Sequence, residues 1–122
     1  MRRFTPWLPA FAWILALYTA SAQSSLPSPS RWGLNDKQVH FMVYGVLGVT
    51  LAWGWLKSRG AVPHWIAVAS GLLYGVADEV HQAFVPGRAP EVGDALADWA
   101  GVIVGYGLVV AVSRLWAKST KA

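Results

Sequence analysis

Apolar residues dominate four long runs of this chain, approximately residues 4–22, 39–56, 65–85 and 95–115. Each run is close to the roughly 20 residues that an α-helix needs to cross the ~30 Å hydrocarbon core of a bilayer. Backbone polar groups cannot be left unpaired in lipid, so the runs should be helical. The pattern predicts an all-α fold, a polytopic membrane protein whose single domain, residues 1–122, forms a four-transmembrane-helix bundle.

The third run carries polar residues where a membrane helix is normally apolar. Asp78, Glu79, His81 and Gln82 fall in its last two turns, and the chain then turns at Pro86-Gly87-Arg88. An ionisable group at the centre of a bilayer costs about 2.5–3.5 kcal/mol on insertion scales, so such residues indicate a functional site. We expect the rest of the chain to position this cluster.

The first run has two interpretations. Arg2 and Arg3 precede it, and it ends in the small residues Ala20, Ser21 and Ala22, which is also the arrangement of a cleaved signal peptide. A retained helix is favoured because the run is longer than a cleaved segment needs. Cleavage would leave three helices with the same outer face.

Helical spacing places polar side chains of the second and fourth runs on defined stripes. Asp36, His40 and Tyr44 stand at i, i+4 and i+8, and Asp94 and Asp98 stand at i and i+4. In an antiparallel bundle the second and fourth runs begin at the side where the third run ends. These stripes and the polar end of the third run should therefore converge.

Glycines in the same two runs are spaced for close helix contact. Gly45 and Gly48 lie near the polar stripe of the second run, and Gly101 and Gly105 form a Gly-x-x-x-Gly pair in the fourth. We expect close helix packing at both places.

The charge distribution predicts the orientation in the membrane. Charged residues make up 13% of the chain and apolar residues 55%, which is too apolar for a soluble fold of this size. The basic residues lie mostly at the ends of runs, where they determine the orientation of the helices in the membrane. The net charge of +4 therefore does not predict a nucleic-acid partner. With both termini cytoplasmic, seven basic residues lie inside (Arg2, Arg3, Lys57, Arg59, Arg114, Lys118, Lys121) and three outside (Arg31, Lys37, Arg88).

In this orientation all six carboxylates gather on the outer half of the bundle or in its loops. The absence of cysteine excludes disulfides and thiolate metal sites. The predicted outer pocket comprises Asp36, Lys37, His40, Tyr44, Asp78, Glu79, Gln82, Arg88, Asp94 and Asp98.

Three motifs around these positions resemble the VanZ-like membrane proteins, over about residues 36–105. They read Asp36-Lys37-x-x-His40-x-x-x-Tyr44, then Asp78-Glu79-x-x-Gln82-x-Phe84-Val85-Pro86-Gly87-Arg88, then Asp94-x-x-x-Asp98-x-x-Gly101. The resemblance implies an integral, multi-helix protein of the bacterial cell envelope and inner membrane. It also implies a link to glycopeptide (teicoplanin) resistance in some relatives, and it supplies no biochemical mechanism.

Three functions remain open for the pocket. In the structural interpretation, the polar network only fixes helix packing, with Arg88 and Lys37 neutralising carboxylates. In the binding interpretation, Arg88 and Lys37 hold an anionic group of a membrane lipid or a lipid-linked envelope intermediate.

In the enzymatic interpretation, Glu79 and His40 are the catalytic candidates. Together with Asp94 or Asp98 they could hold a divalent cation, or act as general acid and base on an outer-leaflet phosphoester. No compact metal signature such as His-Glu-x-x-His is present, so cofactor and metal stay undefined at this point.

Overall fold

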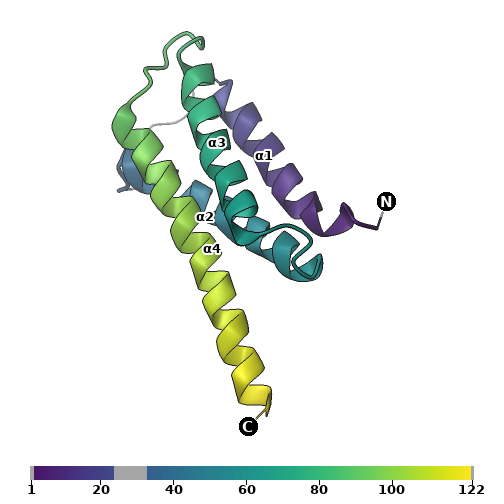
Figure 1. Cartoon of the computed structure of the whole chain (residues 1–122). Helices are drawn as coiled ribbons and strands as arrows, with labels where there is room; N and C mark the ends of the chain where they lie inside the picture. Colours follow the sequence, from purple (N-terminus) through teal and green to yellow (C-terminus); the bar gives the residue numbers. More distant parts are fainter. Residues whose placement is uncertain (1, 24–32, 122) are drawn as a thin grey trace.

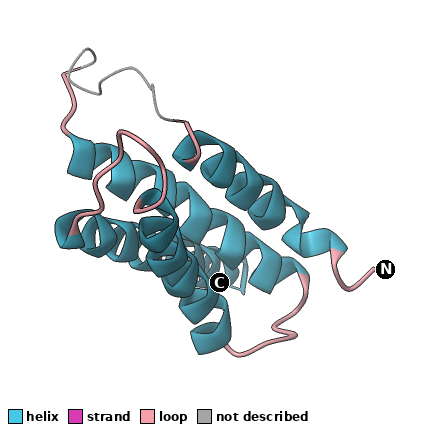
Figure 2. Ribbon diagram, turned by 90° about the horizontal axis from the view of Figure 1, so that it is seen from above, coloured by secondary structure: helices cyan, strands magenta, loops and turns pink. Residues whose placement is uncertain are grey.

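The structure is a computed structural model that describes residues 2–23 and 33–121, and every regular element in these residues is helical (Figure 2). The elements are a 3-10 turn, η1 (Thr5–Trp7), and the helices α1 (Leu8–Ser21), α2 (Asp36–Lys57), α3 (His64–Gln82) and α4 (Val92–Lys121) (Figure 1). The all-α prediction with four helices is confirmed. The largest difference in bounds is at the end of α4, which continues beyond residue 115 to Lys121.

Local sequence explains where α2 and α3 begin. The Asn35 side chain accepts a hydrogen bond from the backbone N–H of Gln38 at 2.8 Å, and the Gln38 side chain accepts one from the backbone N–H of Asn35 at 2.9 Å. This capping box satisfies two free donors at the start of α2. After α2 the backbone takes positive φ at Arg59 and Gly60, and Pro63 then precedes α3. The local sequence therefore accounts for the start of α2 and for the turn that precedes α3.

Two glycines of α4 lie against the backbone of α2, and these two helices form the most extensive helix pair of the described chain. A Cβ added at Gly101 would meet Phe41 O and Gly45 N, and one added at Gly105 would meet Gly45 O. Only residues without a side chain let two helix backbones approach this closely. The predicted close packing is therefore confirmed, and it joins the two helices that carry the polar stripes.

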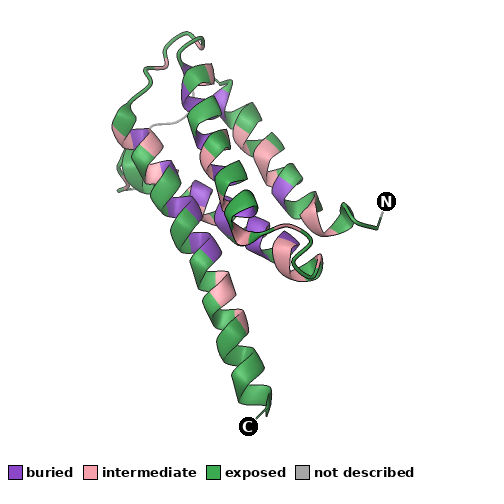
Figure 3. Cartoon of the chain, viewed as in Figure 1, coloured by how far each residue is buried: buried purple, intermediate pink, exposed green. Residues whose placement is uncertain are grey.

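The apolar core lies where the helices meet, and α2 contributes half of it. Buried positions fall on the inward faces, whereas the outward faces are exposed (Figure 3). The buried apolar residues are Ala10, Tyr44, Leu47, Leu51, Ala52, Ala67, Val102 and Tyr106.

Hydrogen bonds as well as apolar contacts attach α1 to its neighbours. The indole N–H of Trp13 donates to Val43 O of α2 at 2.8 Å, and the Tyr74 hydroxyl of α3 donates to Ile14 O at 3.4 Å. Trp13 and Ile14 also pack against the core. The first helix is thus an integral part of the described bundle.

The sides of the helices that face away from the core are largely apolar. Leu73, Leu108 and Trp116, for example, are 70%, 59% and 72% exposed. The last part of α4 extends beyond the other helices (Figure 1). Among the described helices, α2 and α4 are long and apolar enough to cross a membrane. α1 has only 14 residues and α3 ends in polar residues. Length and composition therefore support two of the four predicted spans.

Candidate functional site

Polar side chains from three helices meet at one end of the bundle, where α2 and α4 begin and α3 ends. This arrangement follows from the helical period, which places residues four apart on one face. Most of these side chains are buried, although all but one of the buried ones can ionise. The group comprises Asp36, Lys37, His40 and Tyr44 of α2, Asp78, Glu79 and Gln82 of α3, and Asp94 and Asp98 of α4. We call it the polar site.

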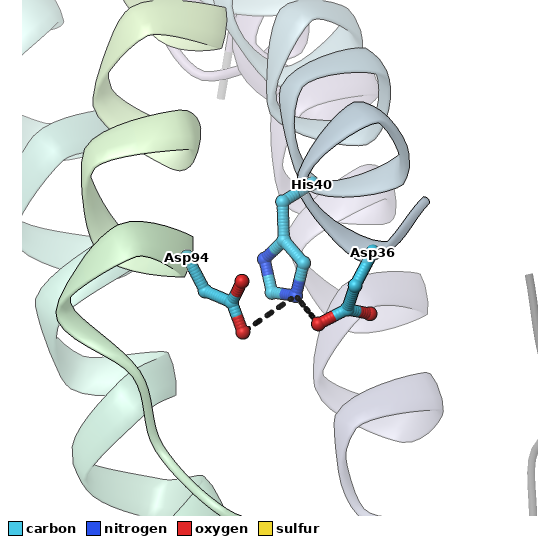
Figure 4. A group of neighbouring side chains, drawn as sticks. All are labelled: Asp36, His40 and Asp94. Carbon is cyan, nitrogen blue, oxygen red and sulfur yellow. Dashed lines mark ion pairs between the residues drawn. The ribbon is translucent and has the colours of Figure 1, made fainter. Parts of the chain in front are cut away.

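His40 lies at the centre of the polar site. Its Nδ1 is 2.7 Å from Oδ1 of Asp98, whose side chain is fully buried. Its Nε2 faces two further carboxylates, 3.7 Å from Asp94 Oδ2 and 3.9 Å from Asp36 Oδ2 (Figure 4). These two separations are too long for hydrogen bonds. One nitrogen of the ring is therefore firmly held, and the other lies between two carboxylates without a direct bond.

Tyr44 and Asp78 form the deepest hydrogen bond of the site. The Tyr44 hydroxyl donates to Asp78 Oδ2 at 2.8 Å, and both residues are buried. Since a buried polar group without a partner is costly, this bond fixes α3 against α2. The motif positions Tyr44 and Asp78 are thus in direct contact.

Several carboxylate oxygens of the site are buried without a hydrogen-bond partner. Glu79 accepts one bond through Oε2, from the backbone N–H of Glu91 at 3.2 Å, whereas its Oε1 has none. Oδ1 of Asp78, Oδ1 of Asp94 and Oδ2 of Asp98 are in the same condition. Such groups are rare in folded proteins and call for an explanation. Gln82 is buried beside them in the last turn of α3.

Lys37 lies at the rim of the polar site. Its Nζ is 3.1 Å from Glu91 Oε2 and 3.6 Å from Asp94 Oδ1, and its side chain is 55% exposed. Glu91 was not among the predicted site residues, and it both pairs with Lys37 and donates its backbone N–H to Glu79. Its position three residues before Asp94 is the signal that could have found it.

Arg88 lies apart from the carboxylates that it was expected to neutralise. Its Nε donates to Gln23 O at 3.0 Å and its NH2 group to Ala20 O at 3.3 Å, at the end of α1. No carboxylate in the described part of the chain pairs with it. The other predicted site residues lie at the same end of the bundle, whereas Arg88 connects the loop after α3 to Ala20 of α1 and to Gln23 just after that helix.

The balance of charge at the polar site is strongly acidic. All six carboxylate side chains of the sequence lie in or beside it, and in the described part of the chain Lys37 and His40 are the basic groups that pair with them. Two sets of three side chains offer metal-ligand atoms that lie within 4.8 Å of one another. The first set is Asp36, His40 and Asp94, and the second is His40, Glu79 and Asp98. The chemistry of these donors suits a cation better than an anion.

An open apolar groove of about 380 Å³ adjoins the polar site. Leu34, Phe41 and Met42 supply its apolar wall, and Lys37 and Gln38 line its polar part. Because Lys37 also pairs with Asp94, the groove and the polar site share a boundary at this residue. An amphipathic molecule could contact both.

A family model described as VanZ/LLP1 matches residues 3–114, nearly the whole chain. The match includes all four helices up to residue 114 of α4, and therefore every residue of the polar site. No curated protein and no solved structure matches the chain.

Proposed function

Because the chain belongs to the VanZ/LLP1 family, we propose that it is a bacterial inner-membrane protein of the cell envelope that binds the headgroup of a membrane lipid at its polar site. In this proposal all four helices cross the membrane, both termini are cytoplasmic, and the polar site opens outward. The packing of α1 through Trp13 and Ile14 supports its retention as the first span.

The observation that carries the proposal is the shared boundary between the apolar groove and the polar site at Lys37. A lipid has an apolar chain attached to a polar headgroup. The apolar wall of the groove could contact the chain, and the adjoining polar site could contact the headgroup. Phe41 and Met42 would contact the chain, and Lys37 the headgroup. The ligand class is a phospholipid or a polyprenyl phosphate that carries an envelope intermediate.

Filling the groove tests this function. Met42→Trp would occupy apolar space that the lipid chain needs, so the purified variant should retain several-fold less phosphatidylglycerol or polyprenyl phosphate, measured by native mass spectrometry. Val49→Trp is the matched control, because Val49 is also exposed on α2 but does not line the groove. Equal retention by wild type and both variants would rule out lipid binding in this groove.

Catalysis is a second candidate, favoured by the 2.7 Å contact between His40 and Asp98 beside Glu79. A carboxylate that fixes a histidine ring is a common arrangement for general acid–base chemistry. Loss of phosphoester turnover in Glu79→Gln with unchanged lipid retention would support an enzyme.

A link to teicoplanin resistance rests on family resemblance alone, and drug-susceptibility measurements on cells with and without the protein would test it.

A further inference from the structure

The starting observation is a pair of carboxylates that have buried oxygens without partners. Glu79 is 8% exposed and Asp98 is 0% exposed. Oε1 of Glu79 and Oδ2 of Asp98 accept no hydrogen bond. No lysine or arginine in the described residues forms an ion pair with either side chain. In the described residues these two desolvated carboxylates have one basic group between them, His40, which pairs with Asp98 and leaves Glu79 without a basic partner.

The spacing of these groups fits a metal ion. His40, Glu79 and Asp98 each offer one ligand atom, and the three atoms lie within 4.8 Å of one another. With metal–ligand bonds of about 2.0–2.6 Å, two ligands on opposite sides of a cation are roughly 4–5 Å apart. Little movement is needed for all three atoms to reach one ion.

We propose that His40, Glu79 and Asp98 bind a divalent cation, with one ligand from each of α2, α3 and α4. One imidazole and two carboxylates form a mixed nitrogen–oxygen set, which suits Mn²⁺ or Zn²⁺. Asp36 and Asp94 lie outside this ligand set and face the other ring nitrogen, Nε2 of His40, at 3.9 and 3.7 Å.

The cation also gives the acidic polar site a way to bind a phosphate. A phosphate oxygen would be repelled by these carboxylates but can complete the coordination of a bound cation. This role rests on the lipid-binding function proposed above, whereas cation binding does not depend on it. The two ideas therefore fail separately in experiments.

The direct test is Mn²⁺ binding to the full chain in detergent without added lipid. Electron paramagnetic resonance follows the loss of the free Mn²⁺ signal, and competition shows whether Zn²⁺ uses the same site. Glu79→Gln should weaken Mn²⁺ binding about tenfold or more, because the neutral amide is a poorer ligand. His40→Gln should do the same, whereas the matched His81→Gln should bind as wild type, since His81 belongs to neither ligand set.

Circular dichroism and gel filtration confirm that each variant is folded, and His40→Gln replaces Glu79→Gln if the latter does not fold. Absence of Mn²⁺ and Zn²⁺ binding by the wild type overturns the inference. A large loss in Asp36→Asn with none in Glu79→Gln overturns the ligand assignment in favour of Asp36, His40 and Asp94. Cation binding without lipid retention refutes the lipid function alone, and lipid retention without cation binding refutes the cation site alone.

Discussion

Individual hydrogen bonds determine how the residues of the polar site respond to substitution, and the Tyr44–Asp78 bond is the most buried of them. Tyr44→Phe would leave Asp78 without a hydrogen-bond partner on either oxygen, because its Oδ1 already has none. A buried acceptor that loses its partner costs about 1–3 kcal/mol of folding free energy. We expect a clear fall in the melting temperature in detergent.

Tyr74→Phe is the matched control for this prediction. The Tyr74 hydroxyl makes a longer hydrogen bond, 3.4 Å to Ile14 O, and the residue is only half-buried. Its removal should therefore lower the melting temperature less. Equal melting of both variants and the wild type would contradict a stabilising role for the Tyr44–Asp78 bond.

The sequence predicted the residues on helices better than those in loops. Asp36, His40 and Tyr44 could be placed together because the helical period fixes their common face. Arg88 was expected among the carboxylates but bonds to carbonyls at the end of α1, because its contacts depend on the path of the loop and on where α1 ends, and neither follows a period. Glu91 was not predicted as a partner of Lys37, although its position three residues before Asp94 places it at the same end of α4.

At the level of elements, the contact between α2 and α4 depends on the missing side chains of glycines on both helices, Gly48 of α2 and Gly101 and Gly105 of α4. Gly105→Ala would place a methyl group against Gly45 O, a backbone atom that cannot move aside as a side chain can. Overpacking of this kind costs about 1–3 kcal/mol. We expect Gly105→Ala to lower the melting temperature and to weaken cation binding, since α2 and α4 carry His40 and Asp98.

Gly107→Ala is the matched control, because it makes the same change two residues later on α4 and nothing lies within 4 Å of the added Cβ. Alanine also favours a helix over glycine by about 1 kcal/mol in water, so Gly107→Ala should be neutral or stabilising. If both variants melt alike, close contact at Gly105 does not limit stability.

On the scale of the whole molecule, the hydrophobic pattern predicted the number of helices but not how far each extends. α4 continues to Lys121, and Lys118 and Lys121 fall in its last turn, where basic side chains interact favourably with the helix end. The polar residues in the last turns of α3 shorten its apolar stretch, and they also contribute side chains to the polar site.

The orientation of the bundle is the remaining prediction at this scale, and it follows from the distribution of basic residues, seven inside against three outside. Reporter fusions after Ala122 or within residues 57–63 should be active only in the cytoplasm. Fusions after Pro29 or within residues 86–93 should be active only in the periplasm, on the side where the polar site would open. A cytoplasmic reporter signal from residues 86–93 would place the polar site on the inner face, where an outer-leaflet lipid could not reach it.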